Sequence, residues 1–430
     1  MSKIVLTEEF FMNPFNEKSV KIDKCVCDWR KLYPAAYDKN ATDAYTKVRT
    51  ILLNGTEFEE NWFMHQLCRH TADNNLRRDV ALLRALEQQQ QKRISFFKPK
   101  DETILETTIS YEQLAVDLTA VLAQTEKNKS VKAALDFALL EDFDHLYRFS
   151  DLLEMEHGIS GEKLVCSYTE IMPGRPTIAE HRHPFDNVRK PIPHDAPLAT
   201  KLHTMTITAA EQQTMNYYMN VGTFYQTSDI GRRLFLEIGS VEEEHVTQYE
   251  SLMDTGTTWL ECLLMHEYAE CYLYYSAMNE ETHDTAKKIW SAHFEQELSH
   301  LHYAADLLKK YEKKEWQQVI PDAEFPPLLS FNDNCEKNKH YIRNVLKNTV
   351  SNTSVLEEYA NINNVPDDYQ YFKYNKAVNK NPSAVASHKV IDCYINEFGE
   401  DYRFTVSDHP VKTLRNRKED NVDLGRIKED

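Results

Sequence analysis

Apolar residues recur at spacings of three and four along most of the chain, which is the pattern of amphipathic α-helices. Short polar breaks, such as Ala72-Asp73-Asn74 and Thr227-Ser228-Asp229, interrupt this pattern and supply residues that cap helix N-termini. Thr258 and Glu261 have the spacing of a capping box. The pattern predicts helices over residues 57–70, 76–93, 111–124, 131–156, 209–226, 230–253, 259–278, 286–311 and 336–349.

The first eight of these helices pair through short breaks into four hairpins, so the predicted fold class is all-α. The composition agrees, because the chain has only 10 glycines in 430 residues, whereas average usage would give roughly 30. Few tight turns are therefore available for a sheet-rich fold or a glycine-rich nucleotide loop. Hydrophobic residues make up 41% of the chain, which is enough for a packed core.

The two halves of the helical region repeat one another. A shift of 154 or 155 residues superposes acidic residues in four pairs, which are Glu57 and Glu211, Glu87 and Glu242, Glu112 and Glu267, and Asp142 and Glu297. Within each hairpin the two acidic residues are 30 or 31 residues apart. The sequence therefore predicts four copies of one helical hairpin.

A proline-rich segment separates the two halves. The predicted divisions are an irregular N-terminal arm at 1–54, a first helical half at 55–157, a linker at 158–205, a second helical half at 206–313 and a C-terminal extension at 314–430. The linker is long enough to leave open whether hairpins pair within one half or between halves.

The formal charge is −18 and the sequence pI is about 5.4, so the chain repels phosphate backbones and attracts cations. We expect no nucleic-acid partner. The sequence has no apolar run of about 18 residues and no secretory signal, so we expect no membrane partner and a cytoplasmic location. None of the eight cysteines forms a CxxC pair, and the only close pair is Cys25 and Cys27. The sequence therefore shows no rubredoxin-like module, and the electron donor is unknown.

The second half contains two acid-x-x-His pairs in equivalent positions, Glu242 with His245 and Glu297 with His300. Residues three apart lie on the same face of a helix, so each pair can bind one metal ion. Spacing alone is weak evidence, because acid-x-x-His occurs six times in the chain and roughly three matches are expected by chance. Position in the repeat selects three of the six, which are these two pairs and Asp142 with His145 in the first half.

We expect the four helices of the second half to bring their repeated acids and histidines to one level of a bundle. So many desolvated carboxylates would repel one another unless cations neutralised them, and a pair of divalent metal ions is the simplest solution. The predicted metal ligands are Glu211, Glu242, His245, Glu267, Glu297 and His300.

These residues resemble the metal-binding pattern of the ferritin-like superfamily, in particular its rubrerythrin-type carboxylate-bridged dimetal proteins. Glu211 and Glu267 are each followed two turns later by a tyrosine, Tyr218 and Tyr274, and Glu270 resembles the additional acid of rubrerythrin-like members. The resemblance implies tandem ferritin-like four-helix bundles and two iron or manganese ions. It also implies redox chemistry on peroxide or dioxygen, of a peroxidase or catalase-like kind, by a dimetal oxidoreductase.

The first half departs from this pattern at two positions. Its equivalent residues include a glutamine in place of one histidine and an aspartate in place of one glutamate; the set is Glu57, Glu87, Gln90, Glu112, Asp142 and His145. We therefore expect the first half to be a degenerate bundle that no longer holds two metal ions.

Three other functions remain open from the sequence. The chain could bind or store iron without turnover, and the negative charge would help to attract cations. It could be an oxygenase, for which an apolar pocket beside Glu211 and Glu267 would be expected. It could also be a helical scaffold with a vestigial site. A homo-oligomer is compatible with each of these functions.

Overall fold

The computed structural model describes residues 12–171 and 188–347, together with 396, 397 and 399. These residues contain no strand, which confirms the all-α prediction. Eight long helices follow one another in hairpins: α1 (Ala44–His70), α2 (Asn74–Phe97), α3 (Ile104–Thr125), α4 (Lys129–His157), α6 (Leu198–Phe224), α7 (Asp229–Glu250), α8 (Trp259–Glu280) and α9 (Asp284–Leu307).

Several helices begin earlier than the sequence pattern predicts. The side chain of Asp43 accepts a hydrogen bond from the Tyr45 N–H and caps α1, so this helix includes part of the predicted arm. Likewise α6 begins at Leu198, within the predicted linker. The capping box of Thr258 and Glu261 is confirmed at the start of α8.

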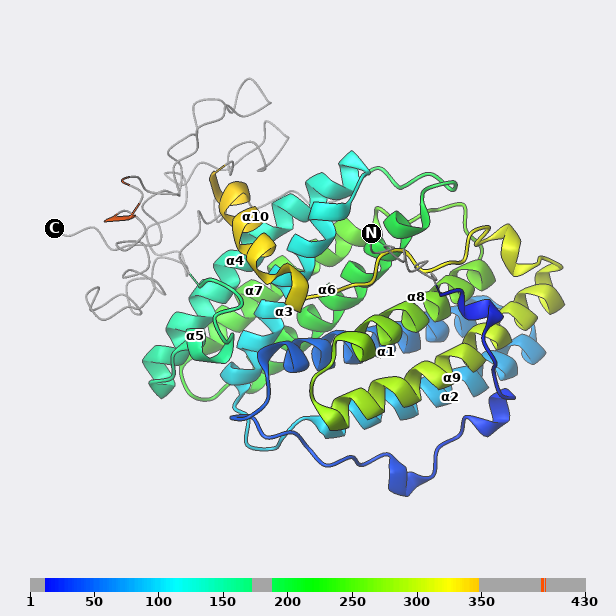
Figure 1. Cartoon of the computed structure of the whole chain (residues 1–430), viewed down its shortest axis with the longest axis horizontal. Coiled ribbons are helices and arrows are strands. Elements are labelled where there is room, and N and C mark those ends of the chain that lie inside the picture. The colour runs from blue at the N-terminus through cyan, green and yellow to red at the C-terminus, as the bar shows by residue number, and fades with distance from the viewer. Residues whose placement is uncertain (1–11, 172–187, 348–395, 398, 400–430) are drawn as a thin grey trace, which may run out of the picture.

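The four hairpins, numbered in chain order, form two four-helix units, and each unit combines one hairpin of each half. Hairpin 1 (α1 and α2) packs against hairpin 4 (α8 and α9), and hairpin 2 (α3 and α4) packs against hairpin 3 (α6 and α7). We call these four-helix units the 1–4 bundle and the 2–3 bundle (Figure 1). The expectation that the second half forms a bundle by itself is wrong, and the alternative that hairpins of different halves pair is observed.

Buried polar contacts hold these cross-half pairs together. Arg49 on α1 lies 3.0 Å from Glu281, which follows α8 directly. Arg148 on α4 lies 3.0 Å from Glu237 on α7. Each contact joins residues that are far apart in the sequence, so local pattern could not indicate them.

The two bundles contact each other along α1 and α6. Gln213 on α6 donates to the Ile51 carbonyl at 2.8 Å and accepts from Asn54 at 2.5 Å. A Cβ atom at Gly55 would come within 2.9 Å of the Gln213 amide, so glycine permits this close approach. The buried apolar residues of both bundles form one continuous core.

Shorter elements surround the bundles. The four-residue α5 (Gly161–Leu164) contacts α3 and α4, and α10 (Cys335–Lys347) packs on the same two helices. Residues 348–395, 398 and 400–430 of the predicted C-terminal extension lie outside the described part of the chain. Among the described helices, none combines the length and the apolar character needed to cross a membrane.

Candidate metal centres

Each bundle contains a cluster of buried carboxylates and imidazoles. The 1–4 centre comprises Glu57, Glu60, Glu87, Glu267, Glu270, Glu297 and His300, and the 2–3 centre comprises Glu112, Asp142, His145, Glu211, Glu242 and His245. Within each overlapping group of three or four of these residues, the candidate ligand atoms lie within 4.8 Å of one another. All thirteen side chains are buried.

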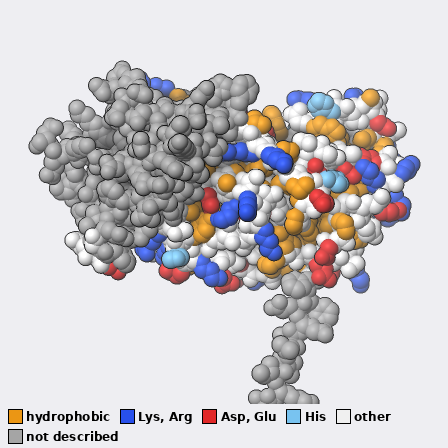
Figure 2. Space-filling model, turned by 90° about the horizontal axis from the view of Figure 1, so that it is seen from above, with side chains coloured by type: hydrophobic (Ala, Val, Ile, Leu, Met, Phe, Trp, Pro, Cys, Tyr) orange, Lys and Arg blue, Asp and Glu red, His pale blue; other side chains and the backbone are white. Residues whose placement is uncertain are grey.

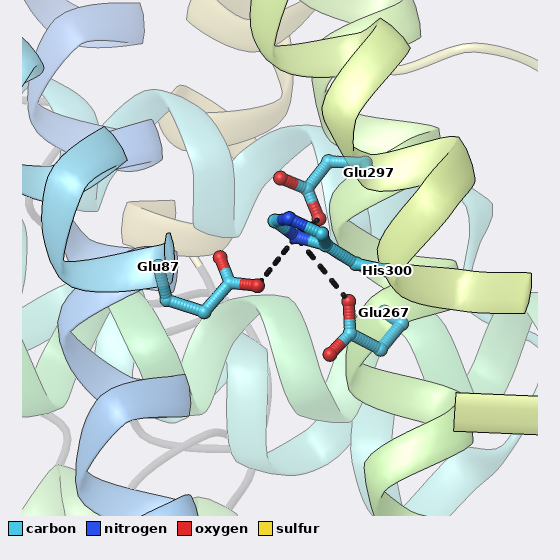
Figure 3. A group of neighbouring side chains, drawn as sticks. All are labelled: Glu87, Glu267, Glu297 and His300. Atoms are coloured by element: carbon cyan, nitrogen blue, oxygen red, sulfur yellow. Dashed lines mark ion pairs between the residues drawn. The ribbon is translucent and has the colours of Figure 1, made fainter. Parts of the chain in front are cut away.

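His300 is the only imidazole of the 1–4 centre and lies among carboxylates from three helices. Its Nδ1 atom is 2.5 Å from Glu87 on α2 and 3.3 Å from Glu297 on α9. It is 3.9 Å from Glu267 on α8. Figure 3 shows these four side chains converging, with Glu87 facing the other three across the bundle. The arrangement offers oxygen and nitrogen donors to a common point.

The remaining carboxylates of the 1–4 centre come from α1 and α8. Glu57 accepts a hydrogen bond from the Tyr274 hydroxyl, which also lies 3.0 Å from His293 Nδ1. Glu60 and Glu270 lie one turn beyond Glu57 and Glu267 on their helices and share a potential binding group with Glu267. These additional acids extend the cluster along the bundle axis.

Gln90 supplies a side-chain amide beside the 1–4 centre, where the repeat would place an imidazole. It corresponds in the repeat to His245, and its Nε2 amide donates a hydrogen bond to Glu297. The amide therefore orients a carboxylate of the centre instead of supplying a nitrogen ligand.

The 2–3 centre has two imidazoles placed on either side of Glu242. His145 Nδ1 lies 3.0 Å from one oxygen of Glu242, and His245 Nδ1 lies 3.1 Å from the other. The rings of the two histidines are 6.2 Å apart. Asp142 and Glu211 lie 3.4 and 3.7 Å from His245 Nδ1. Glu242 thus lies between the two imidazoles, and these three side chains would hold metal ions bound at this centre.

Groups outside the 2–3 centre orient its members. Glu141 lies 2.8 Å from His245 Nε2, on the ring atom that faces away from the cluster. A carboxylate in this position fixes the tautomer that leaves Nδ1 free to bind a metal ion. The Tyr218 hydroxyl donates a hydrogen bond to Glu112, as the Tyr274 hydroxyl does to Glu57 in the other bundle.

Burial of so many acids shifts their proton affinities. Burial raises the pKa of Glu87 to about 8, with a further contribution from Glu297, and burial together with Glu242 raises that of Glu211 to about 8. Glu242 shifts in the opposite direction, because His145 and His245 outweigh its burial and lower its pKa. Without a metal ion, protons must offset much of the negative charge in both centres.

Many carboxylate oxygens in the two centres have no hydrogen-bond donor. Within the part of the chain that the structure describes, neither oxygen of Glu60, Glu211, Glu267 or Glu270 accepts a hydrogen bond. Leaving such a group buried and unpaired typically costs about 1–3 kcal/mol, and more when the group is charged. By contrast, acidic and basic side chains are intermixed on the described part of the surface in Figure 2. Bound cations would satisfy the interior carboxylates, so the donor set fits metal binding.

The structure divides the predicted ligands between the two bundles. Glu211, Glu242 and His245 lie in the 2–3 centre, whereas Glu267, Glu297, His300 and the additional acid Glu270 lie in the 1–4 centre. One expectation is therefore wrong, namely that a single site contains Glu211, Glu242, His245, Glu267, Glu297 and His300. The reason is the cross-half packing of the hairpins, which places the two ExxH pairs in different cores.

The first-half residues are full members of the two centres rather than a separate degenerate set. Glu57 and Glu87 belong to the 1–4 centre, and Glu112, Asp142 and His145 belong to the 2–3 centre. The first half therefore contributes ligand positions to both bundles.

The sequence interpretation overlooked Glu60, Glu141 and His293. Glu60 could have been found, because its spacing from Glu57 equals that of Glu270 from Glu267. Glu141 and His293 act through contacts between different helices, which the local pattern does not indicate.

Comparison with known proteins gives no assignment: no family model, curated protein or solved structure matches the chain. The site itself defines the class as a helical bundle protein with two buried clusters of carboxylates and histidines compatible with metal binding.

Proposed function

We propose that the chain is a non-haem metal protein that binds a pair of iron or manganese ions in each of its two centres. The observation that carries this proposal is the group of buried carboxylates without hydrogen-bond donors in both bundles. Carboxylate and imidazole donors suit iron and manganese, whereas Cu(I) prefers thiolate and thioether ligands. The expected content is about two ions per centre, hence about four per chain.

We further propose redox chemistry on peroxide or dioxygen. The support is the resemblance of the ExxH pairs to rubrerythrin-type dimetal proteins, together with the two histidines that flank Glu242. The bound metal ions would supply the change in oxidation state. The chain's own groups hold the ligands in place: Glu141 fixes the orientation of His245, and Tyr218 and Tyr274 hold carboxylates through hydrogen bonds. Burial excludes bulk water from both centres.

Metal binding without turnover is the second candidate function, and the composition of the 1–4 centre favours it there. This centre has six carboxylates and one imidazole. An excess of hard oxygen donors over nitrogen donors holds highly charged ions strongly. This second function is the alternative to redox chemistry at the 1–4 centre, which would then store or deliver iron.

The test begins with elemental analysis of protein reconstituted anaerobically with Fe(II) or Mn(II). We expect about four ions in wild type and about half as many in either His245→Ala or His300→Ala, because these substitutions affect different bundles. Loss of peroxide consumption in His245→Ala, with retention in His300→Ala, would assign turnover to the 2–3 centre. Absence of bound metal in the reconstituted wild type would refute the proposal.

A further inference from the structure

A pair of cysteines in the N-terminal arm lies on the outside of the 1–4 bundle, across α2 and α9. Gln296 on α9 donates to the Cys25 carbonyl at 2.9 Å, and the Cys27 N–H donates to Gln89 on α2 at 2.8 Å. Gln296 directly precedes Glu297, and Gln89 is two residues after Glu87. The arm is therefore held at the level of the 1–4 centre by the same two helices that supply its ligands.

The Cys25 side chain is a buried neighbour of the imidazole of this centre. Cys25 is buried, with only 5% of its surface exposed. Burial lowers the pKa of His300, but Glu87, Glu297 and then the neighbouring Cys25 thiol raise it, and the net shift is upward. His300 therefore has carboxylates of the centre near its Nδ1 atom and the Cys25 thiol of the arm as a further neighbour.

Among the described residues, the 2–3 centre lacks such a thiol neighbour beside the corresponding part of its imidazole His245. There the outer partner of the imidazole is a carboxylate, Glu141, which lies 2.8 Å from His245 Nε2. A carboxylate in that position only orients the ring and adds negative charge. A thiol can also be oxidised, so the arm gives the 1–4 centre a redox-active neighbour that the 2–3 centre does not have at this position.

Cys25 and Cys27 have the covalent reach for a disulfide. Two residues apart in the chain, their Cα atoms are separated by at most about 7 Å, which is close to the upper limit for a disulfide. Cys27 is half-buried, whereas Cys25 is buried. An external thiol can therefore reach Cys27 and restore the reduced pair by exchange. A cleft of about 610 Å³, lined by Ile22 and Asp23 of the same arm, opens beside this segment.

We propose that Cys25 and Cys27 are the internal electron donor of the 1–4 centre for the reduction of hydrogen peroxide. This inference rests on the proposed redox function. The two thiols lose two protons and two electrons and form one S–S bond between the cysteines. The peroxide O–O bond breaks, and the two electrons and two protons convert the peroxide to two molecules of water.

The experiment uses full-length protein with reduced thiols, loaded anaerobically with Fe(II) and mixed with a stoichiometric amount of hydrogen peroxide. Iron oxidation is followed by absorbance, and the reaction is then quenched with acid and alkylated. Trypsin releases residues 25–30 as one peptide that contains both cysteines and no other cysteine. We expect this peptide to lose two hydrogen atoms and resist alkylation, with two free thiols lost per chain.

Three comparisons decide the outcome. Cys25→Ser and Cys27→Ser should still undergo iron oxidation but leave the iron ferric, whereas Cys68→Ser, which alters a thiol at the far end of α1, should behave like wild type. The disulfide should be absent when metal-free protein receives the same peroxide. Iron oxidation in wild type with both thiols retained would overturn the inference and leave the proposed function intact. Disulfide formation at an equal rate in metal-free protein would also overturn it. No iron oxidation in wild type would refute the function, and the inference with it.

Discussion

The 1–4 and 2–3 centres occupy equivalent places in two bundles of the same plan, but they differ in their ratio of carboxylates to imidazoles. The 1–4 centre has six carboxylates and one imidazole, whereas the 2–3 centre has four and two. With neutral histidines, two divalent ions balance four carboxylates, and two trivalent ions balance six. The 1–4 centre should therefore favour the more oxidised state of a metal pair more strongly than the 2–3 centre does.

Individual positions in the repeat explain this difference. Glu60 and Glu270 correspond to Thr214 and Ala115, so the two additional acids have no counterpart in the 2–3 centre. Gln90 stands where the 2–3 centre has His245. Substitutions at these positions can therefore convert one centre toward the other.

Removal of metal should have the largest effect. A ligand present at 100 times its dissociation constant stabilises the folded state by about 2.7 kcal/mol, so the four expected ions would contribute about 11 kcal/mol. We expect chelation to lower the melting temperature by about 10 °C. Scanning calorimetry before and after chelation measures this change. The variant His145→Ala/His245→Ala should show about half of the wild-type fall in melting temperature. Equal melting temperatures with and without metal would contradict it.

A buried carboxylate outside both centres should make stability depend on pH without any metal. Burial raises the pKa of Asp117 to about 7, although Thr169 donates a hydrogen bond to it at 2.7 Å. The folded state keeps the proton that the unfolded state releases near pH 4, so stability should fall as pH rises from about 4 to 7 and then level off. The full change is about 4 kcal/mol.

Denaturant titrations of wild type and Asp117→Asn, both in chelator, measure this contribution. The wild type should lose stability relative to the variant as pH rises through this window. A constant difference between the two proteins from pH 5 to 8 would show that Asp117 titrates normally.

Removal of the additional acids should reduce the preference of the 1–4 centre for trivalent ions. In a background with His145→Ala/His245→Ala, we expect Glu60→Gln/Glu270→Gln to weaken ferric binding about tenfold more than ferrous binding, roughly 1.4 kcal/mol. Competition with chelators for each ion measures the two affinities. Glu295→Gln is the matched control, because Glu295 is an exposed acid on α9. Equal weakening of ferric and ferrous binding would contradict the electrostatic explanation of the difference between the two centres.

Introducing a histidine at position 90 should have a smaller effect. Gln90→His adds a nitrogen donor where the other bundle has His245, but it removes the amide that holds Glu297. We expect up to about tenfold tighter binding of Mn(II) at the 1–4 centre. Gln90→Leu, which loses the amide without adding a ligand, should bind less tightly than wild type. Tighter binding in both variants would show that a new nitrogen ligand is not the cause.

Helix content and the repeated acids could be predicted from the sequence, because both depend on local pattern. The position of Glu242 and His245 one turn apart follows from helical geometry alone. The assignment of these residues to one site could not be predicted in this way. It depends on which hairpins pack together, and that is decided by contacts such as Arg49 with Glu281 and by the shape of the apolar faces.

The beginning of α1 illustrates a second limit. Residues 44–53 include buried polar side chains such as Thr46 and Arg49, which weaken the amphipathic pattern. Their partner Glu281 lies in hairpin 4, so the sequence gives no local reason to bury them. Tertiary contacts therefore extended this helix beyond its predicted start.

Each candidate metal centre is built from one hairpin of each half. The most direct test is the metal content of two first-half variants, Glu87→Ala and Asp142→Ala, measured by elemental analysis after anaerobic reconstitution. Glu87 belongs to the 1–4 centre and Asp142 to the 2–3 centre, so each variant should lose up to half of the metal bound by wild type. Full wild-type metal content in both variants would contradict this arrangement, because it would show that the first half contributes no ligands.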